Sequence, residues 1–576
     1  MPRANAHDDD HEEERAMRMF GTTTGASSGA CLALIALVLG SAACSAGTTV
    51  EYVNANPTGT PAPDDGTATT SDGTTPDPST SGDPTSKDAP APPLVAGLAI
   101  TDVAFFQAVK VPVVAAGKVV TATKRNAPVV TNRPALVRVY VSPSSAYKGT
   151  SVTAELRLVD GTTRLPVVKD TKTISGASTD ADTESTFNFE VPAESLPPGV
   201  TYQVLLTAKD GAVPTGTNDA RFPRDGGVQS LDAQASGKLK IVIVPVKYTA
   251  DGSGRVPDVT AAQLARYKQT FMARYPASEV EITARTPWVY ASAISANGSG
   301  FSQVLNAVTN LRKTDGVGAD VYYYGALAPT SSFSSFCGGG CVTGLSTVVD
   351  SPSTSFLRAS VGVGYSGDDS VNTAAHEIGH AHGREHAPCG GAQNTDPDFP
   401  YSGGSIGSWG YDIFAKTLLS PTKGHDMMGY CENDWVSDYT YSALFDRIAA
   451  LNGNPASGVT GTTSSASAMP AAKGTPQTFR MANVAADGTV SWTNEIELDQ
   501  EPADGKSMLA TFVSSSGQTL GTHTAHFYPY DHLPGGVLVV PSAPQASSQN
   551  GFAAKARLTT AWSTVRVAGL ANTLSR

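Results

Sequence analysis

The chain has 576 residues and a formal net charge of −12. Because a folding unit typically has about 150 residues, this length predicts a multidomain protein, and we expect three folding units. The acidic balance and the lack of any Lys/Arg cluster argue against nucleic acid or an anionic membrane surface as the main partner. We expect a monomer that is soluble apart from any lipid anchor.

Residues 1–44 are typical of an export signal. An apolar stretch over residues 30–39 is too short to span a bilayer, but it suits a signal-peptide core of about 7–15 residues. Cys44 then resembles the lipid-modified cysteine of bacterial lipoproteins, although Ser41 replaces the usual aliphatic residue three positions earlier. We expect an extracytoplasmic protein, either lipid-anchored through Cys44 or cleaved nearby and secreted.

A linker and a β-domain follow. Residues 45–93 are rich in Thr, Ser, Gly, Pro and Asp and almost lack large apolar residues, so we expect them to be disordered. In residues 94–235, apolar and polar side chains alternate along segments separated by turn residues, as in Val152–Leu158. This period of two predicts antiparallel strands in an immunoglobulin-like β-sandwich.

Residues 236–455 alternate between strand and helix patterns, which predicts an α/β domain. A helix should begin with the capping-box pair Thr260 and Gln263, and the last helix should end at Asn452-Gly453. The expected elements are a strand at Leu239–Val246, a strand at Val280–Ala284, a helix containing Val304–Leu311, a strand at Val321–Tyr324 and a helix at Asp438–Leu451.

A second linker, at residues 456–474, leads into a C-terminal segment with strand patterns at residues 475–576. We expect this segment to form a β-rich, sandwich-like domain. Its three histidines have no carboxylate partner at defined spacing, so we expect surface or packing residues rather than metal ligands. They are His523, His526 and His532.

The segment His376–His386 fills every fixed position of the pattern H-E-x-x-H-x-x-G-x-x-H. On a helix, His376 and His380 lie one turn apart and can bind one cation together. His386 lies off that face, so the helix must end and the chain must turn back. Gly383 suits this turn because glycine adopts left-handed backbone angles without a steric penalty. Three neutral imidazoles with an open position for water are typical of a catalytic Zn²⁺.

The motif also predicts a role for Glu377 and a direction for His382. Glu377 follows the first ligand and can reach a water on the metal, so it is the candidate general base. His382 lies about 240° around the helix from His376 and should face away from the metal. A chance match on a His-rich helix end is the alternative, and the long form of the motif disfavours it.

A second motif, Asp426–Cys431, resembles the methionine-containing turn beneath the zinc of metzincin-clan metallopeptidases. With the histidine motif, it makes the chain similar to metzincins. The segments Tyr322–Gly325, Cys337–Cys341 and Trp435–Tyr439 around the motif make it similar to secreted bacterial metzincins, including mucin-degrading ones.

This resemblance implies a metzincin-like α/β (α+β) catalytic domain in which Met428 is the methionine of the turn. It also implies that Tyr430 reaches the zinc or the transition-state oxyanion, and a buried core phenol is the alternative. Ala387-Pro388 departs from the better-known subfamilies, which leaves the subfamily open.

Four cysteines fall in this expected catalytic domain, and their even number suits two disulfides in an exported protein. Of the three pairings that four cysteines allow, we favour Cys337–Cys341, which closes a glycine-rich loop. We pair Cys389 with Cys431 because these two residues follow the third histidine and the Met-turn. A structural zinc site on these sulfurs is the alternative, but the spacing lacks a paired C-x₂-C pattern.

The sequence thus predicts an endopeptidase that uses one catalytic Zn²⁺ and cleaves proteins or glycoproteins. Calcium sites and substrate specificity stay open. One alternative is a surface adhesin whose β-domains bind glycans or proteins. Another is a serine esterase, since Gly403–Gly407 matches G-x-S-x-G, but Ser405 lacks the flanking strand and helix of a nucleophile elbow.

Overall fold

The computed structural model describes residues 93–208, 217–432, 434–454, 476–543 and 562–576. The expected export signal with Cys44, residues 45–92 of the first expected linker and the whole second linker, residues 456–474, lie outside the described residues. Among the residues that are described, no helix is long and apolar enough to cross a membrane.

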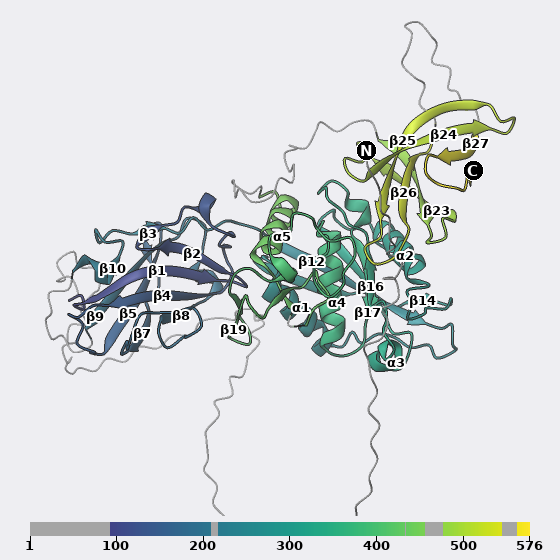
Figure 1. Ribbon diagram of the computed structural model, residues 1–576. Helices are drawn as coiled ribbons and strands as arrows, with labels where there is room; N and C mark the ends of the chain where they lie inside the picture. The colour runs from purple at the N-terminus through teal and green to yellow at the C-terminus, as the bar shows by residue number, and fades with distance from the viewer. Residues whose placement is uncertain (1–92, 209–216, 433, 455–475, 544–561) are drawn as a thin grey trace, which may run out of the picture. The chain divides into compact units, whose positions relative to one another are not determined.

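The N-terminal part of the described chain consists of two antiparallel sheets (Figure 1). Their inner faces share one core, in which Phe105 and Tyr202 from opposite sheets pack edge to face. The first sheet has the order β3 (Lys118–Val119), β2 (Lys110–Ala115), β1 (Leu98–Phe106), β4 (Ala135–Pro143), β8 (Phe187–Val191). The second has β10 (Arg221–Phe222), β9 (Thr201–Ala208), β5 (Val152–Asp160), β6 (Thr163–Arg164), with β11 (Gln229–Ser230) on β9 and β7 (Val168–Lys172) on β5.

The central part is built on a six-stranded, largely parallel sheet. Its strands have the order β13 (Glu279–Ala284), β12 (Lys238–Tyr248), β15 (Val321–Leu327), β17 (Ala359–Val363), β16 (Gly344–Ser346), and β14 (Trp288–Tyr290) also pairs with β12. Only β16 runs antiparallel to its neighbour in this sheet, and it forms one edge. The sheet therefore ends in a short strand, and the turn between β25 (Thr519–Pro529) and β26 (Gly536–Pro541) pairs with its outer side through a bridge between Thr347 and Tyr530.

Helices cover both faces of the central sheet. Neighbouring residues of a strand point to opposite faces, so Tyr322 contributes to the core shared with α1, α4 and α5, whereas Tyr323 contributes to the core shared with α2. The helices are α1 (Ala261–Arg274), α2 (Phe301–Thr314), α3 (Phe333–Cys337), α4 (Asp368–Ala381) and α5 (Asp438–Leu451). Two small strand pairs, β18 (Gly410–Asp412) with β19 (Thr417–Leu419) and β20 (His425–Asp426) with β21 (Asp434–Trp435), lie between α4 and α5 in sequence. This alternation of strands and helices confirms the expected α/β pattern.

The start of α1 differs from the expected capping box. Thr260 accepts the backbone N–H of Gln263 at 3.4 Å, as predicted. The Gln263 side chain, however, exchanges two hydrogen bonds with the backbone of Gly367. The expected return bond to Thr260 is therefore wrong, because the glutamine instead joins the start of α1 to the start of α4.

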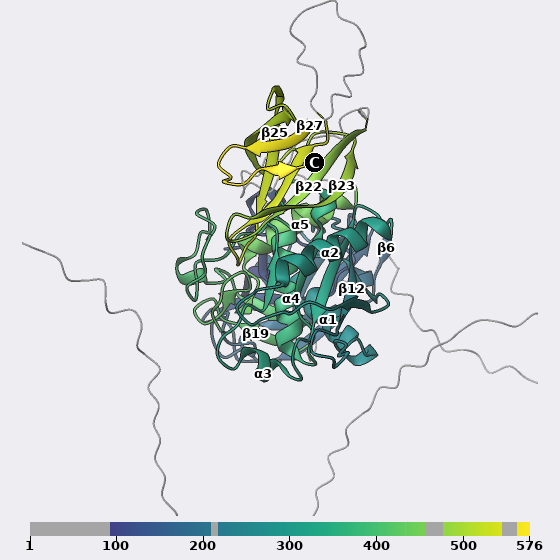
Figure 2. The ribbon, with the colours of Figure 1, turned by 90° about the vertical axis from the view of Figure 1, so that its right-hand side faces the viewer.

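The C-terminal part is one seven-stranded antiparallel sheet (Figure 2). The order is β23 (Val490–Leu498), β22 (Gln477–Val484), β26 (Gly536–Pro541), β25 (Thr519–Pro529), β24 (Lys506–Ser514), β27 (Trp562–Val567), β28 (Leu574–Ser575). The sheet curls until its edge strands approach, and Trp492 of β23 donates a hydrogen bond to the carbonyl of Ser575 in β28. The expected β-rich segment is thus a single curled sheet and not a sandwich. Curling lets one face, with Phe512 and Trp562, bury its own core, while Met481 and Val539 on the other face pack with central-domain residues.

Both expected disulfides are present, Cys337–Cys341 and Cys389–Cys431. His425 lies close enough to Cys389 and Cys431 for the three side chains to resemble a metal-binding site. The two sulfurs are bonded to each other, however, so they are not thiolates and the structural zinc alternative is disfavoured. Two disulfides fit an extracellular protein.

A buried arginine joins the N-terminal sheets to the central part. Arg133 is 0% exposed, and its guanidinium donates to the backbone carbonyls of Gln107, Met272 and Ala277. Met272 lies in α1 and Ala277 follows that helix. The same side chain therefore satisfies carbonyls on both sides of this contact.

Replacing Arg133 should destabilise the protein strongly, because Arg133→Ala leaves two buried carbonyls and one part-buried carbonyl without this donor. We expect the free energy of unfolding to fall by roughly 2–4 kcal/mol, measured by urea denaturation. Arg164→Ala, at an exposed position in β6, is the matched control and should change it by less than about 0.5 kcal/mol. Equal effects of the two substitutions would contradict the proposed contact.

Candidate metal centre

The long histidine motif forms α4 and the turn that follows. The helix ends at Ala381 with His382 as its C-cap, and Gly383 adopts a positive φ of 86°. A Cβ at this position would also lie 2.8 Å from the carbonyl oxygen of Val349. The turn is closed by the N–H of Arg384, which donates to the carbonyl of Gly379. The predicted glycine turn is therefore confirmed, and it folds the chain back toward α4.

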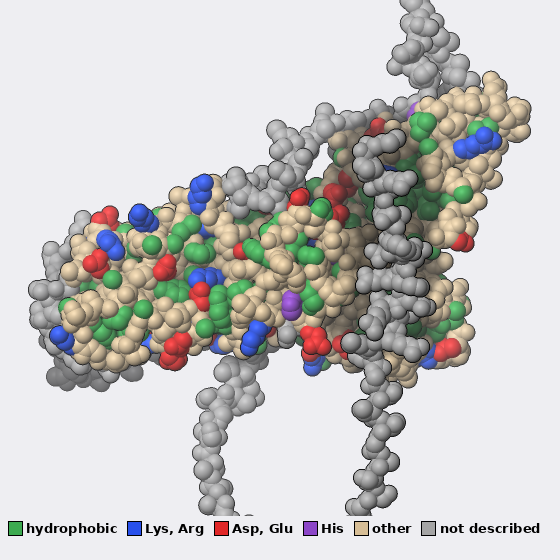
Figure 3. Space-filling view, in the orientation of Figure 1, with side chains coloured by type: hydrophobic (Ala, Val, Ile, Leu, Met, Phe, Trp, Pro, Cys, Tyr) green, Lys and Arg blue, Asp and Glu red, His purple; other side chains and the backbone are tan. Residues whose placement is uncertain are grey.

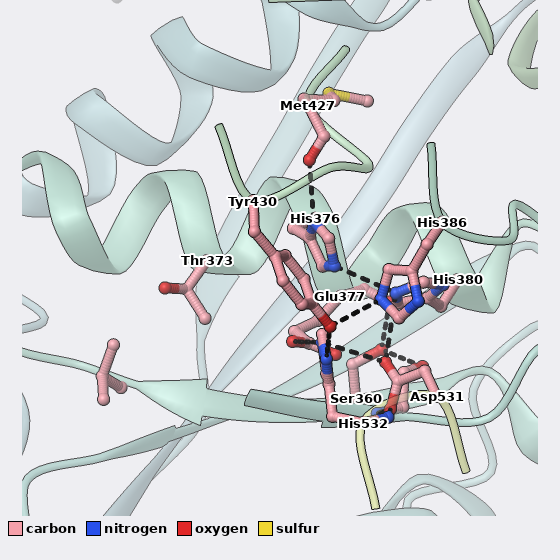
Figure 4. Close-up of polar contacts among 12 residues, drawn as sticks. Ser360, Thr373, His376, Glu377, His380, His386, Met427, Tyr430, Asp531 and His532 are labelled. Carbon is pink, nitrogen blue, oxygen red and sulfur yellow. Dashed lines mark hydrogen bonds and ion pairs between the residues drawn. The ribbon is translucent and has the colours of Figure 1, made fainter. Parts of the chain in front are cut away.

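The three motif histidines face one another (Figure 4). The Nε2 atoms of His376 and His380 are 3.0 Å apart, and the ring centre of His386 lies 5.4 and 4.6 Å from theirs. Each ring places its other nitrogen, Nδ1, at 2.6–2.7 Å from a backbone carbonyl oxygen. For His376, His380 and His386 in turn, these carbonyls belong to Met427, Arg384 and Gln393.

These carbonyl contacts assign the tautomer of each ring. A carbonyl only accepts hydrogen bonds, so Nδ1 carries the proton and Nε2 presents a lone pair. Burial lowers the pKa of His376 well below its usual range, that of His380 to about 3 and that of His386 to about 4. All three rings therefore stay neutral, which is the form that binds metal. Two lone pairs 3.0 Å apart repel unless a cation lies between them, so this donor set fits a metal ion.

The turn with Met427 and Met428 lies against α4 and the segment after it. Met427 contacts the first histidine through its carbonyl, as described above. Met428 is buried, and its sulfur lies so close to Gly379 that a Cβ there would be 2.5 Å away. The carbonyl of Met428 accepts the N–H of Ala387 at 3.1 Å, directly after the third histidine. This turn therefore holds both ends of the histidine motif.

His382 lies on the opposite side of α4 from the cluster, as expected. Its ring stacks on Tyr322 with the ring centres 4.1 Å apart, and Nδ1 contacts the carbonyl of Ile378 at 2.8 Å. The residue therefore packs in the core between helix and sheet.

Glu377 and Tyr430 both reach the histidine cluster. Glu377 is 0% exposed, and burial, with a contribution from nearby Asp531, raises the pKa of its carboxyl well above the usual range. Its Oε2 has no hydrogen-bond partner among the described residues. The hydroxyl of Tyr430 lies 3.0 Å from His386 Nε2. Because Tyr430 is 45% exposed, the alternative of a buried core phenol is wrong.

Two residues of the C-terminal sheet also enter the cluster. The prediction that His532 is a surface or packing residue is wrong, because its Nε2 lies 3.0 Å from Glu377 Oε1 and its Nδ1 contacts the Tyr430 hydroxyl. Asp531 Oδ2 lies 3.2 Å from His380 Nε2. Both side chains come from the turn between β25 and β26 (Figure 4).

The other two C-terminal histidines behave as predicted. His523 packs on Phe512, and Nδ1 of His526 contacts the carbonyl of Asp504. No local pattern distinguishes His532 from the other two histidines in the sequence. Its contact with Glu377 joins positions that are 155 residues apart. The only local signal is the adjacent acid, Asp531, which is too common a neighbour to mark a site.

Ser405 does not form a catalytic pair with any residue that the structure describes. Its hydroxyl donates to the carbonyl of Pro421 at 2.6 Å and accepts the N–H of Gly407. The hydroxyl is thus bonded to backbone groups and not to a general base, which disfavours the esterase alternative.

The ligand assignment predicts different metal contents for two histidine variants. His386→Ala should lower zinc retention after dialysis, since it removes one of three converging nitrogens. His382→Ala should keep near-stoichiometric zinc but lower the melting temperature, because it removes the stacking on Tyr322. Elemental analysis and thermal unfolding distinguish them, and equal zinc loss in both would refute the assignment.

Comparison with known proteins bears on this site. The model of a family described as Peptidase M66 matches residues 182–446, which include α4, the three histidines and the turn at Met428. The match ends before Asp531 and His532. A search of curated proteins found no match. The similarity to Peptidase M66, together with a histidine cluster able to bind a metal, supports a metallopeptidase family for this chain.

Proposed function

We propose that the protein is an extracytoplasmic zinc endopeptidase of the metzincin type. The observation that carries this proposal is the convergence of three neutral imidazoles, from His376, His380 and His386, whose Nε2 lone pairs share one small region. Three such ligands leave a position for water on Zn²⁺. The contact of Met427 and Met428 with this motif supports the metzincin type.

The neighbouring residues suit peptide hydrolysis. Zinc supplies a Lewis acid that polarises the scissile carbonyl and makes a water more acidic. Glu377, whose Oε2 has no partner among the described residues, takes the proton from the attacking water and passes it to the leaving amine. Tyr430 is placed by its hydroxyl beside His386, and it donates a hydrogen bond to the developing oxyanion. The burial of Glu377 strengthens its interaction with the attacking water.

The substrate is a protein or glycoprotein outside the cytoplasm. The signal-like residues 1–44 and the two disulfides support this location. On the face shown in Figure 3, acidic and basic side chains are interspersed. This mixed face and the net charge of −12 support a protein partner over nucleic acid.

Removing the proposed base should separate catalysis from metal binding. Glu377→Ala should keep near-stoichiometric zinc and lower turnover of casein by about 10²–10⁴-fold, the typical contribution of a general base. Glu385→Ala, at an exposed acid in the turn after α4, is the matched control and should keep wild-type turnover. Wild-type activity in Glu377→Ala would refute the role of Glu377 as the general base.

Membrane attachment has its own test, since Cys44 is the proposed lipidated residue. Cys44→Ala should move the protein from the membrane fraction to the soluble fraction of expressing bacteria, because the diacylglycerol anchor is lost. Mass spectrometry of the native N-terminus should show the lipid on wild-type protein. An unmodified N-terminus on soluble wild-type protein would overturn the anchor and support free secretion.

A further inference from the structure

The side chain of His532 contacts both residues that are proposed to act beside the metal (Figure 4). Its Nε2 lies 3.0 Å from Oε1 of Glu377, and its Nδ1 contacts the hydroxyl of Tyr430. The side chain is only 12% exposed, so both contacts form in a setting with little water. One imidazole from the C-terminal sheet therefore joins the proposed base to the proposed oxyanion donor.

The surroundings of His532 Nε2 assign it as a hydrogen-bond donor. Besides Glu377 Oε1, Oδ2 of Asp531 lies 3.5 Å from this nitrogen. An ionised carboxylate only accepts hydrogen bonds, so Nε2 carries a proton. The hydrogen bond that Nε2 donates also stabilises the ionised form of Glu377, which is the form that acts as a base.

The two carboxylate oxygens of Glu377 then have different tasks. Oε1 is held by His532, whereas Oε2 has no hydrogen-bond partner among the described residues. A carboxylate that is held through one oxygen keeps the other oxygen in a fixed direction. The contact with His532 thus leaves Oε2 to take the proton from the attacking water.

The contact with Tyr430 has a similar consequence. Tyr430 is 45% exposed, and its hydroxyl lies 3.0 Å from His386 Nε2. An exposed side chain loses rotamer freedom when it takes up one position for the reaction. The contact with His532 Nδ1 holds the hydroxyl beside His386 before substrate binds, which is the preorganisation that an oxyanion donor needs.

The turn that carries His532 is held by the edge of the central sheet. Tyr530 forms an antiparallel bridge with Thr347, next to β16. The N–H of Asp531 donates to the carbonyl of Ser346 at 3.3 Å, and the N–H of Ser346 donates to Asp531 Oδ1 at 3.0 Å. Oδ1 also accepts the backbone N–H of His532 at 2.7 Å. Asp531 therefore fixes the backbone from which the imidazole projects.

Three further contacts anchor the same turn. Leu533 packs against the apolar core around α2. The hydroxyl of Tyr530 donates to Asn483 of β22 at 2.7 Å, and the amide of Asn394 donates to the carbonyl of Asp531 at 3.3 Å. A functional site needs its side chains to be held within about 0.5 Å, and a turn anchored on both sides meets that need.

We propose that His532 is a positioning residue of the peptidase reaction, which orients Glu377 and Tyr430, and that the C-terminal sheet thereby completes the active site. This inference rests on the proposed zinc peptidase function. A ring nitrogen of His532 lies within 4.8 Å of the ligand atoms of the three motif histidines, so the imidazole lies at the metal site. Glu377 and Tyr430 engage both of its nitrogens, however, which assigns it to these two residues and not to the metal.

The first test compares full-length His532→Ala with His523→Ala, a matched control in β25 of the same sheet. For casein cleavage, kcat of His532→Ala should fall about 100-fold, the typical cost of misplacing a reacting group by about 1 Å. KM and zinc content should stay at the wild-type values, because neither the substrate contacts nor the ligands change. His523→Ala should match wild type in all three measurements.

Two more substitutions separate hydrogen bonding from packing. His532→Gln keeps an N–H donor for Glu377, so it should recover part of the lost kcat. His532→Met fills a similar volume without a donor, so its kcat should be as low as that of His532→Ala. Equal kcat values for the Gln and Met variants would contradict the hydrogen-bonding role.

The remaining outcomes are distinct. A kcat of His532→Ala equal to that of the His523→Ala control would refute the positioning role. A higher kcat would also refute it, and would show that the turn blocks the site. Loss of zinc from His532→Ala would make His532 a metal ligand instead. Failure of the wild-type protein to bind zinc or to cleave any protein substrate would refute the proposed function itself.

Discussion

The site depends on three buried imidazole nitrogens that present lone pairs to one another. Two come from successive turns of α4, and the third returns because Gly383 adopts a left-handed conformation. Backbone carbonyls fix all three rings, and one of these carbonyls belongs to Met427. Without a cation the three nitrogen lone pairs repel one another, so the fold around α4 favours the binding of a metal ion. The disulfide between Cys389 and Cys431 links the two segments that hold this geometry.

Features encoded by local sequence were predictable. The long motif predicts the shared face of His376 and His380, the turn at Gly383 and the direction of His382 away from the other histidines. Helical periodicity and glycine conformation decide each of these features. The alternation of strands and helices in the central part followed from apolar periodicity. The cysteine pairing followed from which segments must meet at one metal.

Features that depend on distant contacts were not predictable. Gln263 matches a capping box, but the approach of Gly367 offers its amide better partners. The C-terminal strands have the pattern of a sandwich, yet curling brings Trp492 to Ser575 and closes one sheet on itself. Asp531 and His532 enter the site only because the C-terminal sheet packs on the core around α2, and no residue spacing records that packing. The positioning role inferred for His532 thus depends on tertiary structure alone.

Zinc is the centre of the proposed activity. The most direct measurement is anomalous diffraction at the zinc absorption edge from crystals of the purified full-length protein. We expect one strong peak among the Nε2 atoms of His376, His380 and His386. A peak only beside His425, or no peak near α4 in zinc-loaded crystals, would contradict the account.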